Sequence, residues 1–147
     1  MNNKPSKERL KKGPLVIIEC PEKIPCNPCV NACPQKAIII EDSLVETPKV
    51  DYQKCIGCLL CIPQCPGLAI FGIHYNYSSK ESLVSLPYEF LPRPKKGDVV
   101  WGVDKNGKKI SKVIVERVIE NPKFNRCAII QVRVKKKYFD KIRMIKL

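Results

Sequence analysis

The 147-residue sequence predicts an α+β protein in two parts, a cysteine-rich domain at residues 15–76 and a small, mostly antiparallel, barrel-like β domain at residues 95–147. Three observations support this prediction. Two similar cysteine clusters, each ending in Cys-Pro and followed by a short β-prone run, form an internal repeat in the first part. Runs rich in Ile and Val, separated by turn signals, follow in the second part. Composition and charge change between the two parts, so we expect a linker at residues 77–94, and we expect residues 1–14 to be a tail.

Short strands are expected in the cysteine-rich part. Four runs are rich in Ile, Val or Tyr and bounded by Pro, Gly or Asp, at residues 15–19, 37–41, 49–52 and 68–73. Single helical turns are expected after Cys29 and Cys58. Gly57 is expected to adopt the positive φ that a tight loop needs.

The second part is predicted to be rich in β-structure. Strands are expected at residues 98–103, 109–120 and 127–135, and the pair Asn106-Gly107 between the first two is a strong hairpin signal. Residues 138–147 are expected to close the chain with one or two helical turns. This pattern predicts a small antiparallel sheet or a partly open barrel.

Positive charge is concentrated in the second half of the chain. Residues 1–85 hold ten Lys/Arg and eight Asp/Glu, a net of +2, whereas residues 86–147 hold seventeen and six, a net of +11. No apolar run approaches the roughly 18 residues of a membrane helix, and no signal peptide is visible, so we expect a cytoplasmic protein without a membrane span. In that reducing compartment, closely spaced cysteines are metal ligands rather than disulfides.

Eight of the nine cysteines fall in two runs that end in Cys-Pro. The second run has the spacing Cys-x2-Cys-x2-Cys-x3-Cys-Pro and comprises Cys55, Cys58, Cys61 and Cys65. The first run comprises Cys20, Cys26, Cys29 and Cys33, with three extra residues between its first two cysteines. In the regular spacing, three thiolates bind one iron–sulfur cubane and the fourth reaches the other.

This crossed ligation predicts two 4Fe–4S clusters. Cluster one is assigned to Cys20, Cys26, Cys29 and Cys65, and cluster two to Cys33, Cys55, Cys58 and Cys61. If Cys20 does not reach its cluster, that site has three thiolates and could hold a 3Fe–4S cluster or take an outside ligand.

Other metal sites fit the sequence less well. A structural zinc site usually takes two separated cysteine pairs around one ion. A Rieske site needs two histidines, and His74 is the only one. The ninth cysteine, Cys127, begins an expected strand far from the other cysteines and is predicted to be a small, half-buried hydrophobe.

Residues 15–73, with their two Cys-Pro-terminated runs, resemble the bacterial two-cluster ferredoxin family. The resemblance implies a ferredoxin-like domain that carries two 4Fe–4S clusters. The form CPEKIPCNPCVNACP and the basic tail containing KGDVVWGVDKNGKKI look like small iron–sulfur subunits of FAD-dependent dehydrogenases of the proline, opine or glycerol-phosphate type. That likeness implies an electron-transfer subunit that is not an enzyme on its own and that takes electrons from a larger flavin-containing subunit.

Two other functions stay open. The basic half could bind RNA or DNA, with Trp101, Tyr138 and Phe139 for stacking and with clusters that are structural or redox-sensing. However, Val99, Trp101 and Val103 share one face of an expected strand, which predicts a core position for Trp101, and we do not expect a nucleic-acid partner. The chain could also be a free soluble ferredoxin, although a mobile carrier needs no second domain.

Overall fold

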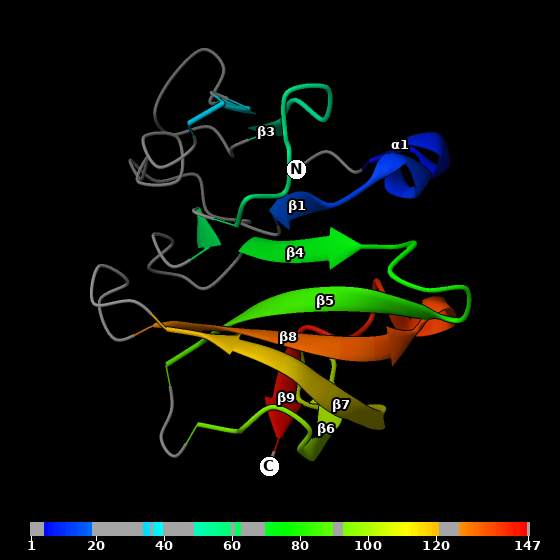
Figure 1. The fold of residues 1–147 in the computed structure, drawn as a ribbon, viewed down its shortest axis with the longest axis vertical. Helices are drawn as coiled ribbons and strands as arrows, with labels where there is room; N and C mark the ends of the chain where they lie inside the picture. Colours follow the sequence, from blue (N-terminus) through cyan, green and yellow to red (C-terminus); the bar gives the residue numbers. More distant parts are fainter. Residues whose placement is uncertain are drawn as a thin grey trace.

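The computed structural model describes residues 5–18, 34–35, 37–39, 49–59, 61–62, 70–89, 93–120 and 127–146. In this part of the chain, seven strands form one antiparallel sheet in the order β1-β4-β5-β8-β7-β6-β9, and β2 pairs with β3 (Figure 1). The elements are α1 (Lys7–Lys12), β1 (Leu15–Ile18), β2 (Ile38–Ile39), β3 (Lys49–Val50), β4 (Ile70–His74), β5 (Glu81–Tyr88), β6 (Val99–Val103), β7 (Lys109–Ile119), β8 (Ala128–Lys135) and β9 (Met144–Lys146).

Most of the expected strands are present. Those expected at residues 15–19, 37–41, 49–52 and 68–73 are confirmed as β1, β2, β3 and β4, and those at 98–103, 109–120 and 127–135 as β6, β7 and β8. The hairpin signal is also confirmed, because β6 and β7 pair and Gly107 has a φ of +85°. The Asp104 carboxylate closes this turn by accepting the N–H groups of Asn106 and Lys108, each at 2.9 Å.

Strand β1 lies at one edge of the large sheet, next to β4. Its four residues are all apolar and three of them are buried, as in a strand that is covered on both faces. The register places Val16 opposite Gly72 of β4. Helix α1 precedes this strand in the range expected as a tail, and the Ser6 hydroxyl caps it by accepting the Arg9 N–H at 3.2 Å.

Strand β5 lies within residues 77–94, the range expected as a linker, where no strand was predicted. It pairs with β4 on one side and with β8 on the other, so a single sheet includes strands from both expected domains. No alternating pattern is visible in its sequence because polar residues are buried there too. Ser82 and Ser85 are 0% and 3% exposed, and their hydroxyls are bonded to the Tyr75 carbonyl at 2.7 Å and to the Gln131 amide at 3.1 Å. The α+β division into two domains stays a prediction.

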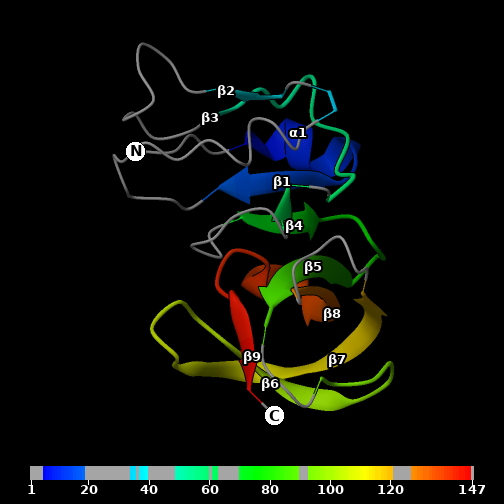
Figure 2. The same cartoon turned by 90° about the vertical axis from the view of Figure 1, so that its left-hand side faces the viewer.

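The strands from β5 to β9 curl toward a barrel. Strand β9 pairs with β6 and also approaches β5, at the other end of this group of strands (Figure 2). The expected helical turns at 138–147 are confirmed in part. The Lys141 and Ile142 N–H groups donate to the Tyr138 carbonyl at 3.0 and 3.2 Å, which closes one turn, and the chain then enters β9. Ile142 and Ile145 are buried in this segment, and β9 adds to the edge of β6, which accounts for the strand.

The core position expected for Trp101 is wrong. Val99 is 61% exposed and Trp101 is half-buried, whereas Val100 between them is buried. A bulge between Gly102 and Val103 shifts the register with β7, so Val103 turns inward although Trp101 does not. The outer face of β6 therefore carries Val99 and Trp101. No helix in the described ranges is long and apolar enough to cross a membrane.

Candidate metal centre

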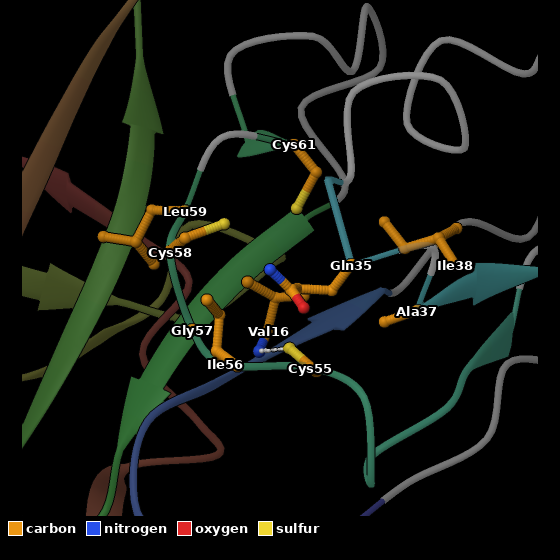
Figure 3. A pocket seen from close by; sticks show the side chains of 10 residues that line it. All are labelled: Val16, Gln35, Ala37, Ile38, Cys55, Ile56, Gly57, Cys58, Leu59 and Cys61. Carbon is orange, nitrogen blue, oxygen red and sulfur yellow. Dashed lines mark hydrogen bonds between the residues drawn. The ribbon is translucent and has the colours of Figure 1, made fainter.

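Three cysteines of the second run line one pocket. Cys55, Cys58 and Cys61 surround it together with apolar side chains of β1, of the segment before β2 and of the loop itself (Figure 3). Cys55 and Cys61 are buried, and Cys58 is exposed. The walls of the pocket are therefore sulfur and hydrocarbon, apart from Gln35.

A tight turn brings Cys55 to this pocket. The Asp51 carbonyl accepts the N–H groups of Lys54 and Cys55 at 3.0 and 3.1 Å, and its carboxylate accepts that of Gln53 at 3.0 Å. A second turn follows Cys58, as expected, because the Ile62 N–H donates to the Leu59 carbonyl at 3.2 Å. The two turns place successive cysteines around one space.

Gly57 has the positive φ that the sequence predicts, at +70°. A Cβ atom at this position would lie 2.6 Å from Pro14 Cβ and 2.7 Å from the Pro14 carbonyl carbon. Glycine is therefore required here for two reasons, because the backbone conformation is left-handed and because the loop touches the residue that leads into β1.

Leu59 anchors the loop on the sheet. It also has a positive φ, at +69°, and its Cδ2 would lie 2.5 Å from a Cβ atom built on Gly72. The missing side chain of Gly72 thus leaves the space that Leu59 fills on β4. This contact holds the cysteine loop against the large sheet.

The backbone of β1 donates a hydrogen bond to a cysteine sulfur. The Val16 N–H is 3.4 Å from Cys55 Sγ, and the pair is buried. Strand β1 pairs with β4 on its other side, so this N–H is directed away from the ladder. Backbone N–H groups directed at ligating sulfur favour the more negative state of a cluster and so tune its potential.

Arg9 of α1 holds the same loop from outside. Its guanidinium donates to the carbonyls of Tyr52 at 2.6 Å, Cys55 at 2.8 Å, and Gly13 and Pro14 at 3.2 Å each. One side chain thus joins α1, the lead into β1 and the residues around Cys55. Burial raises the pKa of the neighbouring Tyr52 hydroxyl above its usual range, while the Arg9 charge acts in the opposite direction.

Five of the expected ligands lie outside the described residues, and these are Cys20, Cys26, Cys29, Cys33 and Cys65. Among the described residues, no three metal-binding side chains are close enough for a single ion. A cubane has an iron at each of four corners, so its thiolates stand further apart than the ligands of one ion. Buried thiols with apolar walls and a backbone N–H directed at sulfur fit such a cluster.

The ninth cysteine is separate from this site. Cys127 is 3% exposed and precedes β8, and burial raises the pKa of its thiol above the usual value. Its Sγ lies 3.5 Å from the Ala128 carbonyl oxygen. The sequence predicts a small, half-buried hydrophobe at this position, and the structure buries Cys127 more deeply than that.

Comparison with known proteins supports iron–sulfur clusters at this site. A family described as the 4Fe-4S dicluster domain matches residues 24–69, which include the described cysteine loop. This match and the relatives below support an iron–sulfur protein of the ferredoxin type, with 4Fe–4S clusters and a role in electron transport.

Two curated proteins are similar to this iron–sulfur protein over part of its length. The polyferredoxin-like subunit of an aliphatic sulfonate oxidoreductase from Pyrococcus furiosus is 37% identical over 54 residues, which are 37% of this chain and 28% of the relative. An uncharacterized polyferredoxin-like protein from Methanocaldococcus jannaschii is 38% identical over 73 residues, covering 42% of each chain. The chain thus spans less than half the length of either relative. No solved structure matches it.

Sequence reasoning missed two functional groups of the site. Arg9 lies in a stretch that reads as a basic tail, and its partners are backbone carbonyls, which have no sequence signature. The Val16 N–H is likewise a backbone group. Neither could be recognised without the pairing of β1 and the path of the loop.

Proposed function

We propose that this protein is an electron-transfer subunit that carries two 4Fe–4S clusters and relays single electrons from a flavin on a partner dehydrogenase subunit. The observation that carries the proposal is the convergence of Cys55, Cys58 and Cys61 on one sulfur-lined pocket inside the matched dicluster segment. One relative is a subunit of an oxidoreductase, which supports a partner complex. Bound clusters supply one-electron chemistry within a range of about −700 to +450 mV.

We assign Cys33, Cys55, Cys58 and Cys61 to cluster two and Cys20, Cys26, Cys29 and Cys65 to cluster one. The structure offers support for the crossed ligand of cluster two. Gln35 and Ala37, close to Cys33 in sequence, line the pocket of the second run. A chain that passes this pocket two residues after Cys33 is consistent with a Cys33 thiolate in the same shell.

The residues of the chain have distinct parts in this function. Cys55 and Cys61 are buried, and Ile38 and Leu59 line the pocket beside them, which limits the access of water to the ligands. The Val16 N–H stabilises negative charge on the Cys55 sulfur. Exposed Cys58 marks the side from which a partner's redox group could approach most closely.

The flavin is proposed to lie on the partner because this chain has no nucleotide-binding motif. The sequence contains neither GxGxxG nor GxxxxGK[ST]. A flavin accepts two electrons from a substrate, whereas each cubane takes one at a time, so two clusters can pass the pair on singly. On this basis the isolated chain is expected to have no dehydrogenase activity.

The proposal is tested by metal analysis of anaerobically purified protein. We expect about eight irons and eight acid-labile sulfides per chain, and an EPR spectrum after dithionite reduction that is broadened by two interacting clusters. Zinc in place of iron, or one cluster only, would contradict the proposal.

The ligand assignment has its own matched pair of variants. Cys58→Ser should remove or convert one cluster and leave the other partly intact. Cys127→Ser removes a thiol outside both runs and should leave iron and sulfide unchanged. Equal iron in both variants would show that Cys58 is not a ligand.

A further inference from the structure

We propose that the outer face of β6 and the lysines beside it dock an acidic protein surface of the partner subunit. This inference rests on the proposed function, since it names the surface by which the subunit is held. The surface comprises Val99, Trp101, Lys109, Lys112 and Lys146, and we call it the Trp–Lys face.

The strand register assembles this face. Trp101 lies opposite Lys112 on β7 and opposite Lys146 on β9, and residues directly opposite each other in a sheet project from the same side. Val99, two residues before Trp101 on β6, extends the same side and is 61% exposed. The register thus places two lysines beside Trp101, with aliphatic Val99 on the same face.

Two of the lysines contact the aromatic ring directly. The Nζ atoms of Lys109 and Lys112 lie 5.0 and 5.5 Å from the Trp101 ring centroid. Such cation–π contacts hold the ammonium groups over the ring while leaving them accessible to solvent. Both lysines are exposed, so their charges are available to a partner.

Three carboxylates on or beside β6 and β7 bond to groups outside the face. Asp98 accepts the Lys95 N–H at 2.8 Å, and Asp104 accepts two N–H groups of the β6–β7 turn. Glu116, further along β7, forms a salt bridge of 2.8 Å with Arg133. Between described residues, no salt bridge joins a carboxylate to a lysine of the Trp–Lys face, so its positive charge is left for a partner to balance.

The details favour an acidic protein surface over a nucleic acid. A base would have to stack on the Trp101 ring, where two ammonium groups already lie. Exposed Val99 adds aliphatic surface that a protein partner can cover, and tryptophan is enriched at the energetic centres of protein interfaces. Lysine ammoniums act as point charges that match scattered carboxylates as well as phosphates.

The test uses the cluster-loaded full chain with two fluorescently labelled probes, a polyglutamate peptide and an oligo(dT) strand of matched charge. The variant Lys112→Gln/Lys146→Gln removes two charges from the face. The control Lys135→Gln/Lys141→Gln removes two exposed charges elsewhere. We expect polyglutamate binding at low salt to weaken roughly three- to tenfold in the first variant and less than about twofold in the control.

Trp101 provides a second readout because it is the only tryptophan of the chain. Polyglutamate should change its fluorescence in the wild-type protein. An equal loss of binding in both double variants, or binding without a change at Trp101, would overturn the proposal in favour of diffuse charge. Tighter binding of oligo(dT), lost in Lys112→Gln/Lys146→Gln, would overturn it in favour of a nucleic-acid face.

Iron and sulfide are measured on the same samples. Full cluster content together with failed polyglutamate binding refutes the docking face alone. Absence of clusters refutes the proposed function, whether or not polyglutamate binds.

Discussion

Replacing Arg9 with alanine should destabilise the cluster loop although Arg9 is not a cluster ligand. The guanidinium donates to four carbonyls, and the two shortest bonds, to Tyr52 at 2.6 Å and Cys55 at 2.8 Å, are partly buried. Alanine would remove the cation and leave these carbonyls to find water. The loop would then be free to move away from α1 and from the lead into β1.

The size of the effect follows from the two short bonds. A hydrogen bond to a charged donor contributes about 1.5 kcal/mol or more, so two give a loss of about 3 kcal/mol for Arg9→Ala. The bonds to Gly13 and Pro14 are longer, at 3.2 Å each, and are not included in this sum. With a urea dependence of about 1–3 kcal/mol per molar, the midpoint should fall by about 1–3 M.

The assay is the urea-induced loss of the clusters' visible absorbance under anaerobic conditions, read together with circular dichroism. Lys11→Ala is the matched control, because it removes the same charge from an exposed position of α1. Arg9→Lys keeps the charge without the planar fork and should recover less than half of the loss. If Arg9→Ala and Lys11→Ala shift the midpoint equally, the carbonyl contacts do not hold the loop and the reasoning is refuted.

Three further predictions concern single positions. Val16→Pro removes the N–H that donates to Cys55 Sγ, whereas Val16→Ala keeps it. An EPR-monitored redox titration should therefore show a lower reduction potential for one cluster in Val16→Pro only. Equal potentials in the two variants would exclude a role for this hydrogen bond. Gly57→Ala should reduce the iron content, because its Cβ would overlap Pro14. Gly107 also has a positive φ but lies in open space, so Gly107→Ala should cost only about 1–2 kcal/mol of stability and leave the iron content unchanged. Burial raises the pKa of Cys127, so the neutral thiol is favoured in the folded protein and alkylation should be slower than in the urea-unfolded protein. In the folded protein, the alkylation rate should increase only above the usual thiol pKa of about 8.5. Mass spectrometry of alkylated peptides reports that rate, and equal rates in both states would contradict the burial argument.

The strands and the cysteine spacing were predictable because both depend on local pattern. Runs of Ile and Val between turn residues predict β6, β7 and β8, and Asn106-Gly107 predicts their first hairpin. The positive φ of Gly57 followed from the need for a tight loop between two cysteines. Spacing of this kind is recorded in the sequence itself.

The errors arise where tertiary pairing overrides the local pattern. Strand β5 was expected as a linker because buried serines resemble loop residues until their bonding partners on neighbouring segments are known. Trp101 was placed in the core by simple alternation, which the bulge at Gly102 interrupts. A bulge shifts the side chains that follow it in a strand, and Gly102 is the local signal in VVWGV that simple alternation leaves out of account.

The continuity of the large sheet gives the proposed docking face a functional consequence. The cysteine loop packs on β4 through Leu59 and Gly72, and β4 is joined by hydrogen-bonded neighbours through β5, β8 and β7 to β6. The Trp–Lys face on β6 lies toward the other end of this sheet from β1 (Figure 1). Paired strands hold their relative positions more closely than segments joined by a flexible linker. A partner that binds the Trp–Lys face therefore also fixes the position of the cysteine loop relative to itself. Electron transfer to a fixed partner benefits from that coupling. A freely diffusing carrier meets its partners at the cluster end, so it gains nothing from a cationic surface at the other end of the sheet from its cluster ligands.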